Sequence, residues 1–506
     1  MGSLSWEKNA LSTLTAVLER GLHDANAVVI PGGPTLSYGA LSAEVERLSE
    51  ELTAHGVVPG RAVSIVLPNS LEFVTIFLAV ARTGAIAAPL NSAYTQDEFN
   101  FFMEDANAQL AITSSENDAA RDAAEGLQIP ILTADSDDAG TTHIFFGGSK
   151  LGEREPAKLP STEDTALFLH TSGTTSRPKG VPLTHGNLAA SLKNIRDTYN
   201  LTSDDVAMVV MPLFHVHGLI GVTLSTFSSG GSIVVPDRFS ATNFWQIQTA
   251  TGATWYSAVP TIHQILLLRA DEDNAPAKSF RFIRSCSSAL APSVFDQLEE
   301  RFGAPVLEAY GMTEASHQMS SSPFDDRRAG TVGKGTGVDI AIMADDGTLL
   351  SPGEIGEVVI NGPNVTHGYT NNPEANKEAF AHGWFHTGDQ GLLSDDGYLS
   401  LTGRLKELIN RAGEKISPLE VDGILLKHPA VNEAVCFAAP DEKYGEVVHA
   451  AVVLGGEATP EEIMEHCRTQ MAEFKVPEVI YFAESLPRTA TGKIQRRHVA
   501  TAFLSD

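Results

Sequence analysis

The stretch Thr171-Ser172-Gly173-Thr174-Thr175-Ser176-Arg177-Pro178-Lys179-Gly180 follows the apolar run 166–169 after one intervening residue, His170. An expected strand that runs into hydroxyls, glycines and a lysine suits phosphate, because backbone N–H groups and small hydroxyls can surround its oxygens while Lys179 adds a positive charge. A Walker A loop has glycine directly before its lysine, and Pro178 stands there instead, which excludes the P-loop class. A polar surface loop remains the alternative, since clusters of Gly, Ser and Thr usually form loops.

Short apolar runs elsewhere in the chain alternate with amphipathic stretches of helical spacing, which predicts an α/β fold with parallel sheets. The runs lie at 62–67, 85–90, 110–113, 207–211 and 232–235. The longer run 73–81 falls far short of the roughly 20 residues that cross a bilayer, so it predicts a buried helix. Three segments have the capping pattern of a helix start, and they are Thr95-Gln96-Asp97-Glu98, Ser417-Pro418-Leu419-Glu420 and Thr459-Pro460-Glu461-Glu462.

The length of 506 residues exceeds what one hydrophobic core normally supports. The sequence becomes turn-rich after the segment 383–389, and two capped helices and the apolar runs 434–438 and 449–453 follow. We therefore predict a large N-terminal domain over 1–402 and a small α+β C-terminal domain over 403–506, joined by a short hinge.

Composition excludes several classes of partner and places the chain in a reducing compartment. Lys and Arg total 35 against 63 Asp and Glu, and this charge of −28 repels nucleic acid and anionic membrane. Three widely spaced cysteines fit neither a disulfide framework nor a metal cluster. The N-terminus lacks a secretion signal and the C-terminus lacks a peroxisomal signal, so we expect a cytoplasmic protein without a membrane partner. Its oligomeric state stays open.

Four residues outside the first stretch have side chains suited to a nucleotide. Tyr310 offers an aromatic face for adenine, and Glu314 offers a hard oxygen ligand for Mg²⁺. Asp389 can accept hydrogen bonds from ribose hydroxyls, and Arg404 can reach the same sugar. An ordinary strand-to-turn segment and a surface salt bridge remain the alternatives for these pairs.

The ordered set of motifs resembles the adenylate-forming superfamily of acyl-CoA synthetases, nonribosomal-peptide adenylation domains and luciferases. The set comprises the stretch 171–180, with Ser176 where the superfamily usually has glycine, and then Tyr310-Gly311-Met312-Thr313-Glu314, Gly388-Asp389, Gly403-Arg404-Leu405-Lys406-Glu407-Leu408-Ile409 and Thr491-Gly492-Lys493-Ile494. The resemblance spans most of the chain. It implies stacked α/β subdomains in the N-terminal domain, a mobile C-terminal domain, and use of ATP, Mg²⁺ and coenzyme A.

The resemblance also assigns roles to individual residues. Lys493, Glu314 and His215 are expected to be catalytic, and Thr175 and Glu314 to hold the metal. Expected nucleotide- and CoA-binding residues are Thr171, Ser172, Gly173, Thr174, Thr175, Lys179, Ser288, Ala289, Glu308, Ala309, Tyr310, Gly311, Met312, Thr313, Asp389, Arg404, Lys406 and Gly413. Lys406 matches the hinge about which the C-terminal domain of the superfamily rotates between adenylation and thioester formation. The segment Gly413-Glu414-Lys415-Ile416 matches the loop that then approaches the CoA tunnel.

The implied acid pocket looks too polar for a fatty or aromatic tail. Its expected residues are His215, Trp255, Ser287, Ser288 and His317. Trp255 can shorten the pocket, while the serines and a cationic His317 can bind a second carboxylate. The His215-x-His217 pair also allows a metal reading, but zinc normally needs at least three protein ligands.

A small diacid fits these walls, and the segments 175–184 and 311–319 resemble those of the oxalate–CoA ligases of plants and yeast. We therefore expect an AMP-forming ligase that converts oxalate to oxalyl-CoA. A ligase for malonate or a short-chain monoacid, an enzyme that loads a carrier protein, a luciferase-like monooxygenase and a binding protein without catalysis remain as alternatives.

Overall fold

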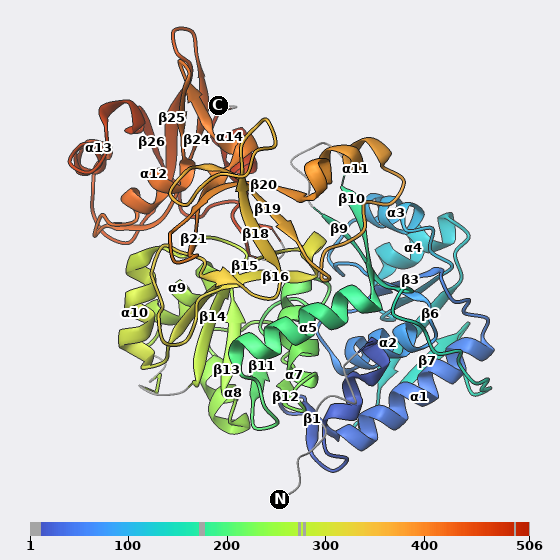
Figure 1. Cartoon of the computed structure of the whole chain (residues 1–506). Coiled ribbons are helices and arrows are strands. Elements are labelled where there is room, and N and C mark those ends of the chain that lie inside the picture. Colours follow the sequence, from blue (N-terminus) through green and yellow to red (C-terminus); the bar gives the residue numbers. More distant parts are fainter. Residues whose placement is uncertain (1–11, 172–177, 272–274, 277–279, 490–491, 505–506) are drawn as a thin grey trace, which may run out of the picture.

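The computed structural model describes residues 12–171, 178–271, 275–276, 280–489 and 492–504 (Figure 1). Within them the strands form four sheets, two large ones in the N-terminal half, a third that follows them, and a fourth in the C-terminal unit. This arrangement confirms the α/β class with a large N-terminal part and a small C-terminal part.

The largest sheet has the strand order β17-β16-β15-β14-β13-β11-β12-β1-β2. Its strands are β1 (Asn26–Val29), β2 (Thr35–Ser37), β11 (Val206–Met208), β12 (Ser232–Val234), β13 (Trp255–Ala258), β14 (Phe282–Cys286), β15 (Val306–Met312), β16 (His317–Ser321) and β17 (Lys334–Gly335). The strands from β12 to β15 are parallel, whereas β16 turns back antiparallel to β15. The carboxyl ends of β13, β14 and β15 therefore meet at one edge, where ligands of α/β sheets usually bind.

The second sheet has the order β10-β9-β4-β3-β5-β6-β7-β8. Its strands are β3 (Ala62–Val66), β4 (Ile86–Pro89), β5 (Leu110–Thr113), β6 (Ile131–Ser136), β7 (Thr142–Phe146), β8 (Ser149–Lys150), β9 (Thr165–Thr171) and β10 (Lys179–Thr184). Strands β9 and β10 pair antiparallel, with Thr171 opposite Lys179 at the end of the pair. The stretch expected to bind phosphate thus begins at the end of β9 and finishes at the start of β10.

The remaining strands form two antiparallel units. One sheet contains β18 (Asp339–Met343), β19 (Gly356–Asn361), β20 (Phe385–Leu393) and β21 (Leu399–Arg404), and the other contains β22 (Ile409–Arg411), β23 (Glu414–Ile416), β24 (Val431–Asp441), β25 (Gly445–Leu454) and β26 (Val479–Phe482). In Figure 1 the second unit forms the orange-red part that lies apart from the blue N-terminal elements. Its own hydrophobic core, around Val421, Cys436 and Ile463, is separate from the core of the large sheets.

The helices cover the sheets, and three of them begin where the sequence predicts. They are α1 (Tyr38–Ala54), α2 (Leu71–Arg82), α3 (Gln96–Asp105), α4 (Asp118–Gly126), α5 (His185–Tyr199), α6 (Val216–Gly218), α7 (Ser225–Phe227), α8 (Phe244–Thr251), α9 (Pro260–Leu268), α10 (Pro292–Phe302), α11 (Pro373–Ala379), α12 (Pro418–Leu425), α13 (Pro460–Arg468) and α14 (Arg496–Leu504). Capping boxes at Thr95 and Thr459 and a side-chain cap at Ser417 confirm the three predicted starts.

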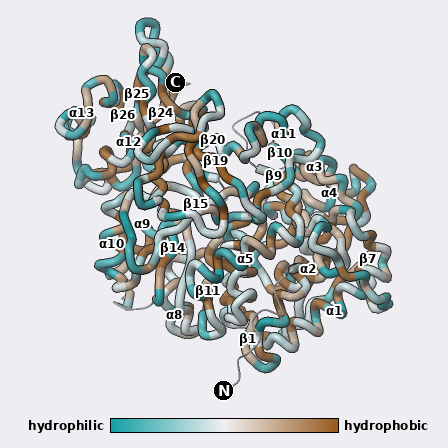
Figure 2. The backbone as a smooth tube through the Cα atoms, viewed as in Figure 1, coloured by the Kyte–Doolittle hydropathy of each residue, from teal (hydrophilic) through white to brown (hydrophobic). Residues whose placement is uncertain are grey.

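Short helical segments join these elements. They are η2 (Leu14–Arg20), the π-helix η3 (Leu219–Leu224), η4 (Thr313–Ala315), η5 (Ala381–Gly383), η6 (Leu405–Glu407) and η7 (Glu473–Lys475). Helix α2 contains the apolar run 73–81 and is almost wholly buried, as predicted. Figure 2 shows hydrophobic segments along the inner strands and hydrophilic ones on outer helices such as α13. Among the described residues no helix is long and apolar enough to span a membrane.

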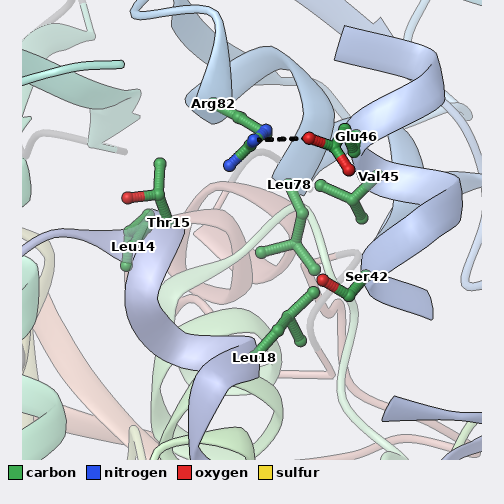
Figure 3. A pocket seen from close by; sticks show the side chains of 8 residues that line it. All are labelled: Leu14, Thr15, Leu18, Ser42, Val45, Glu46, Leu78 and Arg82. Carbon is green, nitrogen blue, oxygen red and sulfur yellow. Dashed lines mark hydrogen bonds and ion pairs between the residues drawn. The ribbon is translucent and has the colours of Figure 1, made fainter. Parts of the chain in front are cut away.

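A hollow lies between η2, α1 and α2, at some distance along the chain from every predicted site residue (Figure 3). Aliphatic and polar side chains line it in equal number, and they are Leu14, Leu18, Val45, Leu78, Thr15, Ser42, Glu46 and Arg82. Its two charged groups are already paired with each other, since Arg82 lies 3.3 Å from Glu46. The hollow therefore belongs to the packing of the N-terminal helices.

The C-terminal unit is held to its last helix by a buried arginine. Arg496 in α14 lies 2.8 Å from Asp422 in α12 and also donates to the carbonyl of Cys436 in β24. Glu407 in η6 lies 3.3 Å away on the other side. One guanidinium thus joins a helix, a strand and the segment that leads into the unit.

Replacing Arg496 by alanine should destabilise the C-terminal unit by about 3–5 kcal/mol, because Asp422 then remains buried without its charged partner. Denaturant unfolding followed by fluorescence and circular dichroism measures this. The matched control is Arg468→Ala, which removes a half-buried arginine paired with the exposed Glu461 and Glu465 and should leave the midpoint nearly unchanged. Equal midpoints for the two variants would contradict the role given to Arg496.

Candidate active site

Tyr310, Asp389 and Arg404 come together although they lie far apart in the sequence. The Tyr310 hydroxyl donates to Asp389 Oδ2 at 2.5 Å, and Arg404 Nε lies 2.9 Å from Asp389 Oδ1. Asp389 and Arg404 face each other in register on β20 and β21. Burial, followed by the charge of Asp389, raises the pKa of Tyr310 well above its ordinary value, so its ring stays neutral. The trio presents an aromatic ring, a carboxylate and a guanidinium, which suits a nucleoside.

Glu314 lies in η4, directly after β15, and is almost fully buried. Tyr369 donates its hydroxyl to Glu314 Oε1 at 2.8 Å, and the Lys179 ammonium lies 4.5 Å from the centre of the Tyr369 ring. Burial raises the pKa of Glu314. A divalent cation would offset that desolvation, and a carboxylate is its preferred protein ligand. Glu314 therefore fits the metal role expected from the sequence, beside the lysine expected at the phosphates.

The strand β15 and the turn after it carry Glu308, Ala309, Gly311, Met312 and Thr313. A Cβ at Gly311 would lie 2.0 Å from the carbonyl oxygen of His317, so only glycine allows β16 to approach here. Burial raises the pKa of Glu308 to about 8, and its Oε1 has no partner among the described residues. The neighbouring segment after β14 places Ser288 half-buried and Ala289 exposed.

Lys493 reaches the same region from the C-terminal unit. Its backbone N–H bonds to the Thr489 hydroxyl, and the neighbouring Gly492 carbonyl accepts from Arg488. By relative surface area Lys493 is exposed, although neighbouring residues of both parts of the chain surround its ammonium. Enclosure by the surrounding protein, followed by the charge of Arg404, lowers its pKa, and its ammonium in turn lowers the pKa of His215. Lys493 is thus poised near Asp389, Arg404 and His215.

Two histidines of the motif 214–217 have different surroundings. His217 is fully buried, with Nε2 2.6 Å from the Ser257 hydroxyl and Nδ1 3.0 Å from the Ser287 hydroxyl. His215 is half-buried, caps α6 through the backbone N–H of His217, and has a pKa lowered to about 4, chiefly by burial. No group of three metal-binding side chains exists among the described residues, which leaves the metal reading of this pair without support.

Arg284, in the middle of β14, is the main site residue that the sequence analysis missed. It is fully buried and donates to Tyr199, Ser257, His317 and Gln318 at 2.7–3.0 Å. All four acceptors are neutral groups. No carboxylate pairs with Arg284 in the described part of the chain. A charged residue inside an otherwise apolar strand was the signal that could have found it, because buried arginines are rare.

His317 lies at the start of β16 and stacks on His217, with ring centroids 5.3 Å apart. The expectation that His317 is cationic is wrong. Its buried position, followed by the charge of Arg284, holds its pKa well below the ordinary value. The positive charge of this pocket therefore belongs to Arg284, and His317 is a neutral imidazole.

Trp255 does not contact the polar cluster of Arg284, His317 and His217. It starts β13, is fully buried, and stacks on Phe282 with ring centroids 4.9 Å apart. The side chain that reaches the polar cluster from this strand is Ser257, two residues later on the same face. Trp255 thus packs in the core near the opposite end of the strand.

The expected hinge and CoA-loop residues lie in the segments that follow Arg404. Lys406 is exposed in η6, between β21 and the C-terminal unit. Gly413 is exposed at the turn between β22 and β23, with a φ of 99°, a value that favours glycine. Four expected phosphate-binding residues, Ser172, Gly173, Thr174 and Thr175, lie outside the described residues.

The chain matches two known family models and is similar to known enzymes over nearly its full length. The AMP-binding enzyme family model matches residues 17–370, and the AMP-binding enzyme C-terminal domain matches residues 420–493. The chain is similar to the oxalate–CoA ligase of Arabidopsis thaliana (49% identity, 98% of this chain and 99% of that one) and to that of Saccharomyces cerevisiae (46%, 95% and 95%).

A solved structure of ATP-bound MatB from Rhodopseudomonas palustris superposes with a TM-score of 0.88 at 30% identity, covering 97% of this chain and 99% of that one. The two family models follow one another in the same order as the two parts of the fold. The chain therefore belongs to the AMP-binding enzyme family, within the adenylate-forming superfamily.

Proposed function

We propose that this protein is an oxalate–CoA ligase that uses ATP, Mg²⁺ and coenzyme A and releases AMP and pyrophosphate. Its relatives of 46–49% identity include two oxalate–CoA ligases that match nearly the full chain. In this proposal the small domain begins near residue 403, and the hinge lies at Lys406, in the segment η6 that directly follows β21.

The observation that best supports a small diacid as the substrate is the buried charge of Arg284. A buried cation is costly unless an anion compensates it, and its four protein partners are neutral. An acid with a second carboxylate supplies the missing negative charge, whereas an aliphatic or aromatic tail does not. The polar cluster of His217, Ser257, Ser287 and His317 likewise offers hydrogen bonds rather than apolar surface.

The first half-reaction forms the acyl-adenylate. A carboxylate oxygen of the acid attacks the α-phosphorus of ATP, and the bond from that phosphorus to the bridging oxygen breaks, so that pyrophosphate leaves with the electron pair. Asp389 and Tyr310 hold the nucleoside, and the Lys493 ammonium offsets the negative charges that approach one another. Glu314 would hold Mg²⁺, which supplies further charge neutralisation at the phosphates.

The second half-reaction forms the thioester. The CoA thiolate attacks the activated carbonyl, the bond to the AMP oxygen breaks, and AMP leaves. Lys493 and the exposed loop with Gly413 lie on the same C-terminal unit. A rotation about the Lys406 segment would withdraw the lysine and bring this loop toward the site, as hinge motions do in other enzymes. No covalent bond to the protein is needed in either half.

The test of the proposed substrate is product analysis with ATP, Mg²⁺ and CoA across oxalate, malonate, acetate, a medium-chain acid and coumarate. Oxalate should give AMP and a CoA thioester at the highest kcat/KM. A higher kcat/KM for another acid would support the reaction class but refute oxalate as the preferred substrate. A free carrier protein in place of CoA tests the carrier-loading alternative, and thioester formation on that protein alone would favour it.

Lys493→Ala should lower the rate of adenylate formation by about 100- to 1,000-fold, because it removes a cation that acts on developing charge. ATP affinity should change little, since the nucleoside contacts remain. Pyrophosphate release and equilibrium ATP binding measure the two quantities. Lys443→Ala, which removes an exposed lysine at the turn between β24 and β25, is the matched control. A large loss of ATP binding in Lys493→Ala would contradict a role confined to the reaction.

As pH rises, the rate of adenylate formation should begin to fall at a lower pH than it would for a lysine with an ordinary pKa. The lowered pKa of Lys493 means that the ammonium loses its proton as pH rises through a value below the usual lysine range. Lys493→Arg keeps its charge there, so its residual rate should stay flat over the same interval. Single-turnover rates at a series of pH values check this, and a shared alkaline fall would assign the titration to another group.

His317→Ala should reduce kcat/KM for oxalate about 10-fold or more, through loss of one hydrogen bond to a charged group. The loss for acetate should be much smaller, because acetate has no second carboxylate to receive that bond. Steady-state kinetics with both acids measures the difference. If both acids lose equally, His317 does not distinguish the diacid.

A further inference from the structure

The four hydrogen bonds of Arg284 constrain the protons of the polar cluster. An arginine has donors and no acceptor, so the atom opposite each N–H must accept. Arg284 Nη2 lies 2.9 Å from His317 Nε2, so that nitrogen carries no proton. A neutral imidazole then carries its proton on Nδ1. This Nδ1–H has no hydrogen-bond partner among the described residues, although His317 is 98% buried with only 2% exposed.

A second chain of bonds leaves Arg284 in the direction of Ser287. Arg284 Nη1 donates to the Ser257 hydroxyl oxygen at 3.0 Å. All bonds of the chain are satisfied when the Ser257 O–H donates to His217 Nε2 at 2.6 Å and His217 Nδ1–H donates to the Ser287 oxygen at 3.0 Å. The Ser287 O–H is then left free to donate to a ligand. Both series of hydrogen bonds therefore start at the Arg284 guanidinium, and each ends in a donor without a protein acceptor among the described residues.

The backbone supports this arrangement at a conformational cost. His317 has a φ of 93° and Ser287 a φ of 74°, both in the left-handed region that non-glycine residues rarely adopt. Such strain gathers at functional sites, where the surrounding structure enforces it. Gly221 in the π-helix η3 is also required, because a Cβ there would lie 2.4 Å from His317 Nε2 and 3.4 Å from Arg284 Nη1.

We propose that Arg284 is a positioning residue that directs both hydrogen-bond chains, so that His317 Nδ1–H and Ser287 O–H together receive the second carboxylate of the acid. This inference rests on the proposed function for the identity of the acid. Arg284 contributes its charge through the two chains rather than by contact with the acid. In this proposal two neutral donors bind the carboxylate, and the buried guanidinium of Arg284 orients both of them.

The charge of Arg284 also keeps His317 from titrating. The titratable groups that face His317 are Arg284 from β14, His217 from α6 and His215 at its N-cap. Burial and these positive or potentially positive groups all lower the pKa of His317. Removing the guanidinium should therefore raise that pKa toward the ordinary value. At lower pH the ring would then become an imidazolium and would itself supply the missing positive charge.

The experiment measures kcat/KM for oxalate between pH 6 and pH 8 in the wild type and in Arg284→Gln, Arg284→Lys, His317→Asn and the Arg284→Gln/His317→Asn double variant. Relative to the wild type, Arg284→Gln should lose about 10- to 100-fold at pH 8, the effect of one or two charge-assisted bonds. The loss should shrink as pH falls to 6, when His317 gains its proton. Arg284→Lys keeps a cation and should show no such recovery.

His317→Asn retains a donor near the Nδ1 position, cannot titrate, and tolerates a positive φ better than most residues. The double variant should therefore show the loss of Arg284→Gln without its recovery at low pH. A loss in Arg284→Gln that is equal at every pH, or a recovery that persists in the double variant, would overturn the proposal. Merely structural damage predicts the first of these outcomes.

Histidine-selective ¹⁵N NMR of the free wild-type enzyme tests the same inference without any substrate. The His317 signals, assigned by their loss in His317→Asn, should be those of a neutral ring protonated at Nδ1. A ring protonated at Nε2 would refute the proposal even if oxalate is turned over. If oxalate is not a substrate, the proposed function fails while this spectrum still decides the tautomer. Should Arg284→Gln not fold, Gly221→Ala keeps the guanidinium, displaces the ring from it and should shift this signal.

Discussion

The buried guanidinium of Arg284 constrains the whole acid pocket. It lies inside β14 with four neutral acceptors around it, so every neighbouring proton has to point away from it. This one requirement makes His317 neutral and orients Ser257 and His217. No carboxylate in the described part of the chain balances the positive charge of Arg284. A pocket of this kind favours a small anionic ligand and excludes an apolar tail.

The fold supplies the other half of the site by converging several chain segments. Parallel β14 and β15 end at the same edge, β16 turns back across Gly311, and the pair of β20 and β21 presents Asp389 and Arg404 beside Tyr310. Lys493 arrives from the separate C-terminal unit, whose core does not depend on the large sheets. Tyr310, Arg284 and Asp389 thus lie in the large N-terminal part, whereas Lys493 lies in the C-terminal unit. In the proposed function this division allows one site to carry out two successive reactions.

The sequence predicted the architecture well because the architecture follows from local patterns. Apolar runs separated by helical stretches, capping residues at Thr95, Ser417 and Thr459, and the order of the motifs each depend on neighbouring residues. The acid pocket depends instead on contacts between distant segments. Arg284 was missed because its partners come from α5, β13 and β16. Trp255 was misplaced because the end of a strand that lies at the site is set by the whole sheet, and Trp255 begins β13 at the other end. The protonation of His317 likewise follows from burial and a neighbouring charge, which a motif does not contain.

The central claim is that the pocket recognises the negative charge of a second carboxylate. Calorimetric binding of oxalate and of oxamate to the enzyme with a non-hydrolysable ATP analogue and Mg²⁺ tests it most directly, because oxamate has nearly the same shape with a neutral amide in place of one carboxylate. Oxalate should bind at least about 100-fold more tightly than oxamate, because oxamate lacks one charged hydrogen-bond partner at a buried site. Equal affinities for the two ligands would contradict it.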